Sequence, residues 1–272
     1  MKESDIKKFV RAGYAEVAKK GNSCFSCNPS CCGSTNTAEA VSKQVGYSEE
    51  DLQSVPEGAN LGLGCGNPIA LASLKEGETV LDLGSGAGFD CFLAAQKVGQ
   101  NGKVIGVDMT PEMIKRANVI AEVENYKNIE FRLGEIEALP IEDSSVDLII
   151  SNCVINLSPD KKQVFAEISR VLKNSGKVMI SDIVLLKPLP ESILKSSEAY
   201  TSCIAGAILK DEYIGLMKQA GLANVQIIEE TVYSSDCFID EELQESLGKK
   251  ENNDIGQSIV SIKISAMKSA EI

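Results

Sequence analysis

The sequence predicts an α/β protein built on a parallel sheet, and three observations lead to this expectation. Short apolar segments recur from residue 79 onward, each typical of a strand. Segments of helical periodicity fit between them, so the strands are expected to run parallel with helices on both faces of the sheet. A glycine-rich turn at residues 84–88 directly follows the first strand, as in folds that bind nucleotide cofactors.

The elements follow in chain order. Residues 5–20 place apolar side chains near helical spacing and end at Gly21, which predicts an amphipathic helix. Residues 21–37 are rich in Cys, Ser, Asn and Gly and predict a loop, before a short helix and an irregular Gly-rich passage in residues 46–68. Strands are expected at residues 79–83, 103–109, 129–133, 146–154, 177–185, 224–230 and 258–266, and late helices near 190–200 and 211–220.

Helix ends can be assigned from capping residues. Thr110-Pro111 and Ser158-Pro159 each offer an N-cap residue followed by proline at the first helical position. Gly176 is expected to end the helix that precedes the fifth strand.

Composition narrows the classes of function. The chain has 272 residues, 43% of them hydrophobic, which is enough for one large domain with a sizeable core. Its net charge of −12 disfavours nucleic acid and anionic membrane surfaces as partners. The first residues lack the apolar stretch of a signal peptide, and no apolar run approaches a membrane span, so a cytoplasmic location is expected.

The cysteine and histidine counts narrow the chemistry further. Nine cysteines is an odd number, and in a reducing cytosol they are expected to act as ligands or redox groups rather than structural disulfides. The chain contains no histidine, which excludes a Ser-His-Asp triad, a Cys-His pair and a His-ligated zinc site.

A cofactor site is expected where the first strand meets the glycine turn. Glycines there allow close backbone approach to a ligand, and Gly84, Ser85 and Gly86 are candidate contacts. Asp108 and Met109 end the second strand, where a carboxylate can accept the two hydroxyl protons of a ribose.

Two cofactor classes use such a turn. A dinucleotide site requires G-x-G-x-x-G, whereas this turn reads G-x-G-x-G with Asp82 two positions before it. Asp82 would repel a pyrophosphate but attract the cationic amino group of S-adenosylmethionine, so the charges favour the sulfonium cofactor over NAD. The alternative is a strand-to-helix turn that binds no ligand.

Two later segments fit the same cleft. Glu135 can accept a hydrogen bond from the adenine amino group while Ile136 packs on the ring. Asn152 lies near the end of the fourth strand, where open α/β sheets bind ligands. Each signal is weak alone, since loops often contain Glu and Asn often forms turns.

Three cysteines lie at places that suggest chemistry. Cys153 ends the fourth strand beside the expected methyl group, Cys203 follows the fifth strand, and Cys65 lies in a Gly-rich passage that would bury little. Only the fold could bring them together. The alternative for each is a small buried apolar residue, which is the expected role of Cys91 and Cys237.

The N-terminal loop contains four more thiols, Cys24, Cys27, Cys31 and Cys32. Four thiolates could bind zinc tetrahedrally. However, adjacent residues rarely direct both sulfurs to one ion, so a flexible thiol-rich loop is the favoured interpretation.

Residues 46–235 resemble the arsenite methyltransferases. The segments that carry the resemblance are NLGLGCGNP, VLDLGSGAGFDCF, VIGVDMTPEMI, LGEIEALP, SNCVINLSPDK and SCIAGA. GLGCGNP and SNCVINL are highly specific, whereas the glycine motif alone would indicate only a class I methyltransferase.

The resemblance implies a Rossmann-like class I methyltransferase sheet of seven strands with the last antiparallel. It implies that Cys153 and Cys203 bind arsenic, that Cys65 is a third catalytic cysteine, and that one cysteine of the N-terminal loop also takes part; by distance from Cys65, Cys32 is the candidate. The implied division is residues 1–45 as N-terminal helix and Cys-rich loop, 46–186 as the S-adenosylmethionine domain, and 187–272 as a C-terminal arsenic-site lobe with the closing strands.

The chemistry agrees with this resemblance. Trivalent arsenic prefers thiolates, and its lone pair can attack a sulfonium methyl without losing a proton. Arsenite and methylarsenite are the expected substrates, and a thioredoxin or glutathione-like thiol reductant is the expected electron source. Two alternatives remain: a class I methyltransferase with a small organic acceptor, and a thiol-based metalloid binder without catalysis.

Overall fold

A seven-stranded sheet forms the centre of the computed structural model, which describes residues 3–21, 37–194, 203–232 and 257–269 together with Tyr200 and Ile255. The strand order is β3-β2-β1-β4-β5-β7-β6, parallel throughout except that β7 runs antiparallel to both neighbours. This confirms the predicted sheet. The strands are β1 (Thr79–Leu83), β2 (Lys103–Asp108), β3 (Ile129–Leu133), β4 (Val146–Asn152), β5 (Leu172–Leu185), β6 (Leu222–Val232) and β7 (Ile259–Lys268).

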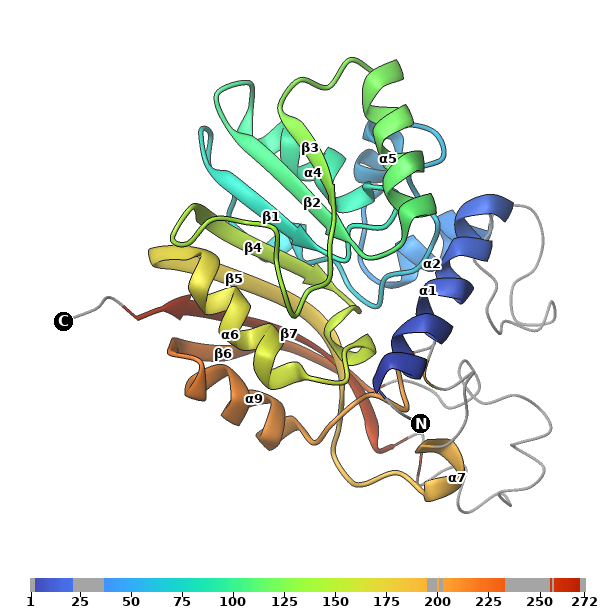
Figure 1. Cartoon of the computed structure of the whole chain (residues 1–272), viewed down its shortest axis with the longest axis vertical. Coiled ribbons are helices and arrows are strands. Elements are labelled where there is room, and N and C mark those ends of the chain that lie inside the picture. The colour runs from blue at the N-terminus through green and yellow to red at the C-terminus, as the bar shows by residue number, and fades with distance from the viewer. Residues whose placement is uncertain are drawn as a thin grey trace.

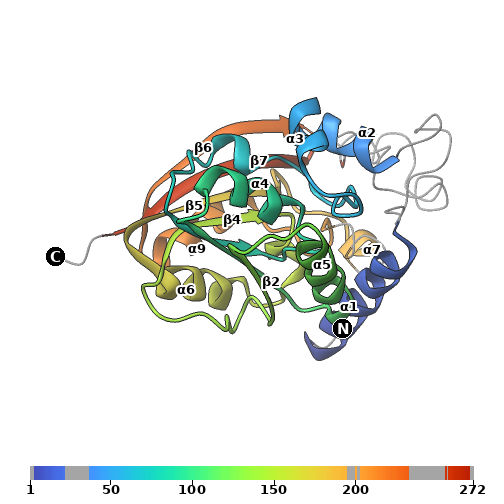
Figure 2. The same cartoon turned by 90° about the horizontal axis from the view of Figure 1, so that it is seen from above.

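Helices cover both faces of this sheet (Figures 1 and 2). The apolar side of α4 (Phe89–Val98) packs with α5 (Pro111–Val123) in one buried cluster. The opposite cluster joins α6 (Lys161–Val171) to α9 (Lys210–Gln219), with Phe165 against Tyr213. Alternate residues of β1 enter the two clusters, as the period of a strand requires.

The N-terminal part adds shorter helices near the cofactor turn. Helix α1 (Glu3–Lys20) lies against α5, as Figure 1 shows. The other short elements are α2 (Thr37–Gln44), which the sequence did not predict, α3 (Glu49–Ser54), the 3-10 turns η1 (Ile69–Leu71) and η2 (Ile155–Leu157), and α7 (Glu191–Leu194). Among the described residues no helix has the length and apolar character to span a membrane.

Two of the four predicted helix ends are confirmed and two are wrong. Helix α1 ends at Lys20, directly before Gly21. Thr110 is the N-cap of α5 with proline after it. Helix α6 begins two residues later than Ser158-Pro159 predicted, because Asp160 accepts the backbone N–H of Gln163 at 3.0 Å. Gly176 does not end α6, which stops at Val171, but lies inside β5.

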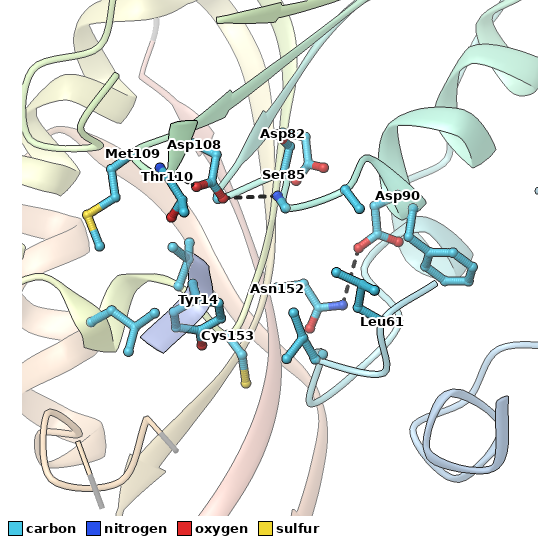
Figure 3. Close-up of a pocket in the computed structure, with 18 of the residues that line it drawn as sticks. Tyr14, Leu61, Asp82, Ser85, Asp90, Asp108, Met109, Thr110, Asn152 and Cys153 are labelled. Carbon is cyan, nitrogen blue, oxygen red and sulfur yellow. Dashed lines mark hydrogen bonds between the residues drawn. The ribbon is translucent and has the colours of Figure 1, made fainter. Parts of the chain in front are cut away.

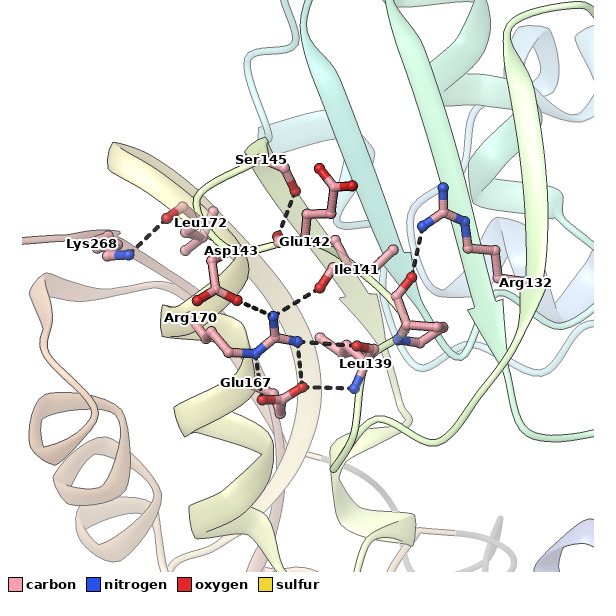
Figure 4. A network of polar contacts seen from close by, with 11 residues as sticks. Arg132, Leu139, Ile141, Glu142, Asp143, Ser145, Glu167, Arg170, Leu172 and Lys268 are labelled. Carbon is pink, nitrogen blue, oxygen red and sulfur yellow. Dashed lines mark hydrogen bonds and ion pairs between the residues drawn. The ribbon is translucent and has the colours of Figure 1, made fainter.

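An arginine network fixes the loop between β3 and β4 (Figure 4). The Arg170 guanidinium donates to Glu167 at 2.7 Å, to Asp143 at 2.6 Å and to the carbonyls of Ile141 and Leu139 at 2.8 and 3.1 Å. Glu167 also accepts the Leu139 N–H at 2.7 Å. The network holds the loop whose first residues border the candidate site.

Candidate active site

A cavity opens at the carboxyl ends of β1, β2 and β4, where parallel sheets bind ligands. Asp108 ends β2 and Asn152 ends β4, so both side chains reach this edge (Figure 3). Helix α1 closes one side, because Lys7 and Tyr14 belong to the lining. Segments far apart in the sequence thus enclose the space.

The glycine turn after β1 forms the floor of the cavity. Gly84 and Gly86 have φ of +67° and +54°, a region that favours glycine. An added Cβ on Gly84 would meet Val154, whereas one on Gly86 would have nothing within 4 Å. The Asp108 carboxylate accepts the N–H of Gly86 at 3.0 Å and of Thr110 at 2.8 Å. A ligand therefore has free access to the backbone at Gly86.

Two buried carboxylates line the same wall. Asp82 is 3% exposed and Asp90 is 7% exposed. Burial raises the pKa of Asp90 to about 6, against the hydrogen bond that Tyr47 donates at 2.7 Å. Burial and the nearby Asp90 raise the pKa of Asp82 well above its usual value, while the Cys91 thiol donates to it at 3.2 Å. A cationic group bound in this pocket would favour the charged form of both carboxylates.

Sequence reasoning missed Asp90 and Tyr47. Asp90 was available as the second residue of the helix after the glycine turn, but an acidic residue in a first helical turn is ordinary. Tyr47 precedes a short helix and carried no motif. Its partnership with Asp90 is long-range, 43 residues along the chain.

Asn152 joins the two ends of the cavity. Its carbonyl oxygen accepts the N–H of Cys65 at 3.0 Å, and its amide donates to the Gly66 carbonyl at 2.8 Å and to Asp90 at 3.2 Å. One side chain therefore holds both the Cys65 loop and a carboxylate of the cofactor wall.

Of the remaining residues predicted to bind the cofactor, three line the cavity and one does not. Ser85, Met109 and Ile136 line the cavity. Glu135 is absent from the lining, and its carboxylate pairs with Lys7 at 2.7 Å and with Arg11 at 3.1 Å. In this segment it is instead the Glu137 carboxylate that borders the cavity. It accepts the Ser158 hydroxyl at 2.6 Å and pairs with Lys7 at 3.0 Å.

The three predicted cysteines lie in one buried cluster at the end of the cavity that Cys153 lines. Cys65 and Cys153 form a disulfide with an S–S distance of 1.98 Å. The Cys203 thiol donates to the Cys153 carbonyl at 2.9 Å. Three distant segments thus bring these cysteines into one buried cluster.

The backbone at two of these cysteines is unusual. Cys153 has φ of +55° and Cys203 has φ of +63°. Non-glycine residues rarely occupy this region, and functional sites concentrate such strain. Tyr14 of α1 shares a hydrogen bond with the Cys203 thiol, so the helix that covers the cavity also contacts its sulfur end.

A buried carboxylate lies behind the sulfurs. An oxygen of Asp182 and the Sγ atoms of Cys65 and Cys153 lie within 4.8 Å of one another. Burial raises the pKa of Asp182 to about 7, and burial together with the charge of Asp182 raises that of Cys203. Sequence reasoning missed Asp182, since one acidic residue within an apolar strand carries no motif.

The remaining cysteines divide by position. Cys91 is fully buried, as predicted, but also donates to a carboxylate. Cys24, Cys27, Cys31, Cys32 and Cys237 lie outside the described residues, so the role of Cys32 stays a prediction.

Known proteins share this sequence and arrangement. A methyltransferase domain family model matches residues 74–221. An arsenite methyltransferase of Halobacterium salinarum is 45% identical over 98% of this chain and 67% of its own length. The chain belongs to the arsenite methyltransferase family.

Further comparisons extend to other members of the arsenite methyltransferase family. The human arsenite methyltransferase is 34% identical over 84% of this chain and 61% of its own length. A solved arsenic(III) S-adenosylmethionine methyltransferase from Chlamydomonas reinhardtii superposes with a TM-score of 0.66 at 34% identity, covering 87% of this chain and 75% of that one. The chain spans 54% to 67% of the length of the first curated relatives it matches.

The cavity of this arsenite methyltransferase family member has two parts. The cofactor half comprises Asp82, the turn Gly84–Gly86, Asp90 and Asp108, and the thiol half comprises Cys65, Cys153 and Cys203. The cofactor half fits S-adenosylmethionine, because it offers buried carboxylates for an ammonium, a further carboxylate for ribose hydroxyls and open space above Gly86.

Proposed function

We propose that this protein transfers a methyl group from S-adenosylmethionine to trivalent arsenic held by Cys65, Cys153 and Cys203. The observation that carries the proposal is a cluster of three cysteines from distant segments, at the end of the methyltransferase cavity that Cys153 lines. Three thiols satisfy the coordination of a soft trivalent centre. An organic acceptor would give these sulfurs no role.

Arsenic capture requires no base in this arrangement. Each arsenic–sulfur bond replaces an As–OH and an S–H bond, and the proton leaves with the hydroxyl as water. The raised pKa of the Cys203 thiol keeps it protonated, which is the form that this exchange consumes. A chain with no histidine can therefore load its substrate.

Methyl transfer then depends on alignment. When bound, S-adenosylmethionine supplies a methyl group activated by its sulfonium. In the proposed complex, Asp108 orients the ribose and the Asp82–Asp90 pair orients the amino acid end. Bound arsenic attacks the methyl carbon with its lone pair, and holding both partners in line contributes up to roughly 7–11 kcal/mol toward lowering the barrier.

The thiols also return electrons after transfer. Methylation takes arsenic from the trivalent to the pentavalent state. Two thiolates can leave arsenic as a disulfide, which gives it two electrons and restores the trivalent state. The Cys65–Cys153 disulfide supports this pair as the donor. We infer that a thioredoxin or glutathione-like reductant then opens the disulfide, directly or through Cys32, which agrees with action in a reducing cytoplasm.

The test is incubation with arsenite, S-adenosylmethionine and a thiol reductant, followed by speciation of the arsenic. Methylarsenic that appears only with both substrates and reductant supports the proposal. Bound arsenic without methylated product would indicate a metalloid binder. Absence of both, with methyl transfer to a small organic thiol or amine instead, would contradict it.

A further inference from the structure

Asp182 of β5 lies against the thiol half and is fully buried. Its carboxylate accepts three hydrogen bonds: from the Asn156 amide at 2.9 Å, the Ile183 N–H at 2.9 Å and the Tyr213 hydroxyl at 3.1 Å. These three donors favour the charged form of the carboxylate, against the burial that raises its pKa to about 7. The described surroundings of the three sulfurs thus include a fixed acidic group.

The proposed reaction moves a positive charge toward this group. When the As–C bond forms and the S–C bond breaks, the cofactor product leaves neutral and arsenic gains the charge. Loss of the Cys65 and Cys153 thiolates as a disulfide leaves a methylarsenic cation on Cys203, until a thiol or water adds to arsenic and releases a proton. Arsenic is therefore cationic from transfer until this addition.

We propose that Asp182 is the counter-charge to the methylarsenic cation and lowers the barrier to methyl transfer. The inference rests on the proposed function and adds a residue to that site. One Asp182 oxygen lies within 4.8 Å of both disulfide sulfurs. A negative charge fixed in a buried place stabilises developing positive charge more than the same charge in water.

The charged and titratable groups near Asp182 determine how far its negative charge is offset. Lys161 is the nearby cation that interacts with Asp182, and its ammonium donates to the carbonyls of Ser158 at 3.0 Å and Asn156 at 3.5 Å rather than to the carboxylate. Asp182 also opposes the ionisation of Cys203, Tyr14 and Tyr213. The carboxylate is thus offset only partly, because the Lys161 ammonium donates to backbone carbonyls and forms no ion pair with it.

The charge can be tested by removing it and, separately, by removing the cation that opposes it. Protein loaded with one equivalent of arsenite receives excess S-adenosylmethionine, and methylarsenic is measured over a single turnover. Asp182→Asn removes the charge and should slow transfer about 100-fold. Lys161→Met removes the opposing cation and should leave the rate unchanged or raise it. Tyr213→Phe, the matched control, removes one hydrogen bond from Asp182 but keeps its charge, and should change the rate by no more than about fivefold.

Two binding measurements separate charge from folding. Arsenic retained after desalting and the calorimetric affinity for S-adenosylmethionine should match the unmodified protein in all three variants. Asp182→Asn at the unmodified rate, or equal slowing in all three, would overturn the inference. If Asp182→Asn fails to fold, the Lys161→Met variant provides the test. A tenfold or greater fall in its rate of methyl transfer would contradict a charge effect. Unmodified protein that makes no methylarsenic would instead remove the proposed function, and this inference with it.

Discussion

The cofactor half and the thiol half of the cavity are built in opposite ways. The cofactor half comes mainly from one stretch, residues 82–90, with Asp108 added from the next strand. The thiol half joins Cys65 and Cys153 across 88 residues, and Cys203 lies another 50 residues on. A local motif can specify the first half, whereas only the completed sheet can assemble the second.

The two halves also differ in backbone conformation. The cofactor half uses glycines where φ is positive, and Asp108 accepts the neighbouring N–H groups. The thiol half places cysteines in the same region, at a cost of about 1–3 kcal/mol each. The surrounding packing must stabilise this strain, which is consistent with a function for the sulfurs rather than a structural role.

The largest expected effect tests the thiol half. Cys153→Ser and Cys203→Ser should each eliminate methylation of arsenite, because a hydroxyl is a hard, poor ligand for arsenic. Calorimetry should show nearly unchanged affinity for S-adenosylmethionine, since the cofactor half stays intact. Cys91→Ser is the matched control: the same substitution beside Asp82 should leave arsenic capture normal. Substantial turnover in either variant would remove that cysteine from the ligand set.

The variant Gly86→Val tests the cofactor half instead of the thiol half. Its side chain would enter the open space above the glycine turn, at a φ of +54° that disfavours any side chain. Binding of S-adenosylmethionine should be lost in calorimetry, while the protein still retains arsenite after desalting. Gly215→Val, in helix α9 with nothing within 4 Å, provides a control. Normal cofactor binding by Gly86→Val would place the cofactor elsewhere.

The difference between the halves explains what the sequence could predict. Asp82, Gly86 and Asp108 were found because a strand, a turn and a strand end fix their relative positions locally. The cysteines were assigned from their resemblance to a family, and nothing in their spacing predicted that Cys65 would lie beside Cys153. All seven strands were predicted to within a few residues, except that β5 begins five residues early.

The errors have local physical causes. Ser158 was assigned as an N-cap from the proline after it, but Asp160 takes the capping position and Ser158 bonds to Glu137 instead. Gly176 was assigned to a helix end on composition, although the strand already pairs at Leu172. Asp90 and Asp182 were missed because burial and long-range partners, rather than neighbours in sequence, distinguish them.

A smaller effect on methylation is expected from the substitution Cys65→Ser. The first methylation replaces one thiolate on arsenic by carbon, so methylarsenite needs only two sulfurs. Cys65→Ser should therefore impair methylation of arsenite severely and spare methylarsenite more, measured as the ratio of the two initial rates with external thiol present. Equal loss on both substrates would reduce Cys65 to a structural residue.

Peptide mapping after turnover without added reductant tests the electron source. The structure favours a disulfide between Cys65 and Cys153, whereas the family resemblance implied that a cysteine among Cys24–Cys32 also takes part and could pair with Cys65. Either disulfide would identify Cys65 as an electron donor, and the partner found would decide between them. Free thiols at Cys65 after turnover would leave external thiols as the only source.

The smallest expected effect lies outside both halves, at the Arg170 network. Arg170→Met leaves Glu167 partly buried without its cation and should lower the free energy of unfolding by about 1–3 kcal/mol. The loop that carries Ile136 would loosen, so the KM for S-adenosylmethionine should rise while arsenic retention stays normal. Lys97→Met on exposed helix surface is the control.

The pH dependence of that variant gives a second check. Arg170 donates hydrogen bonds to Glu167 and holds the pKa of this carboxyl below its usual value of 4.5. A group with a depressed pKa in the folded state stabilises the fold above its unfolded pKa and loses that contribution as pH falls. The stability difference between unmodified and Arg170→Met protein, measured by urea unfolding, should therefore be full at neutral pH and narrow below 4.5. A difference that stays constant across this range would mean that Arg170 acts through its packing and carbonyl contacts, and that charge pairing with Glu167 contributes nothing to the loop that borders the cofactor half.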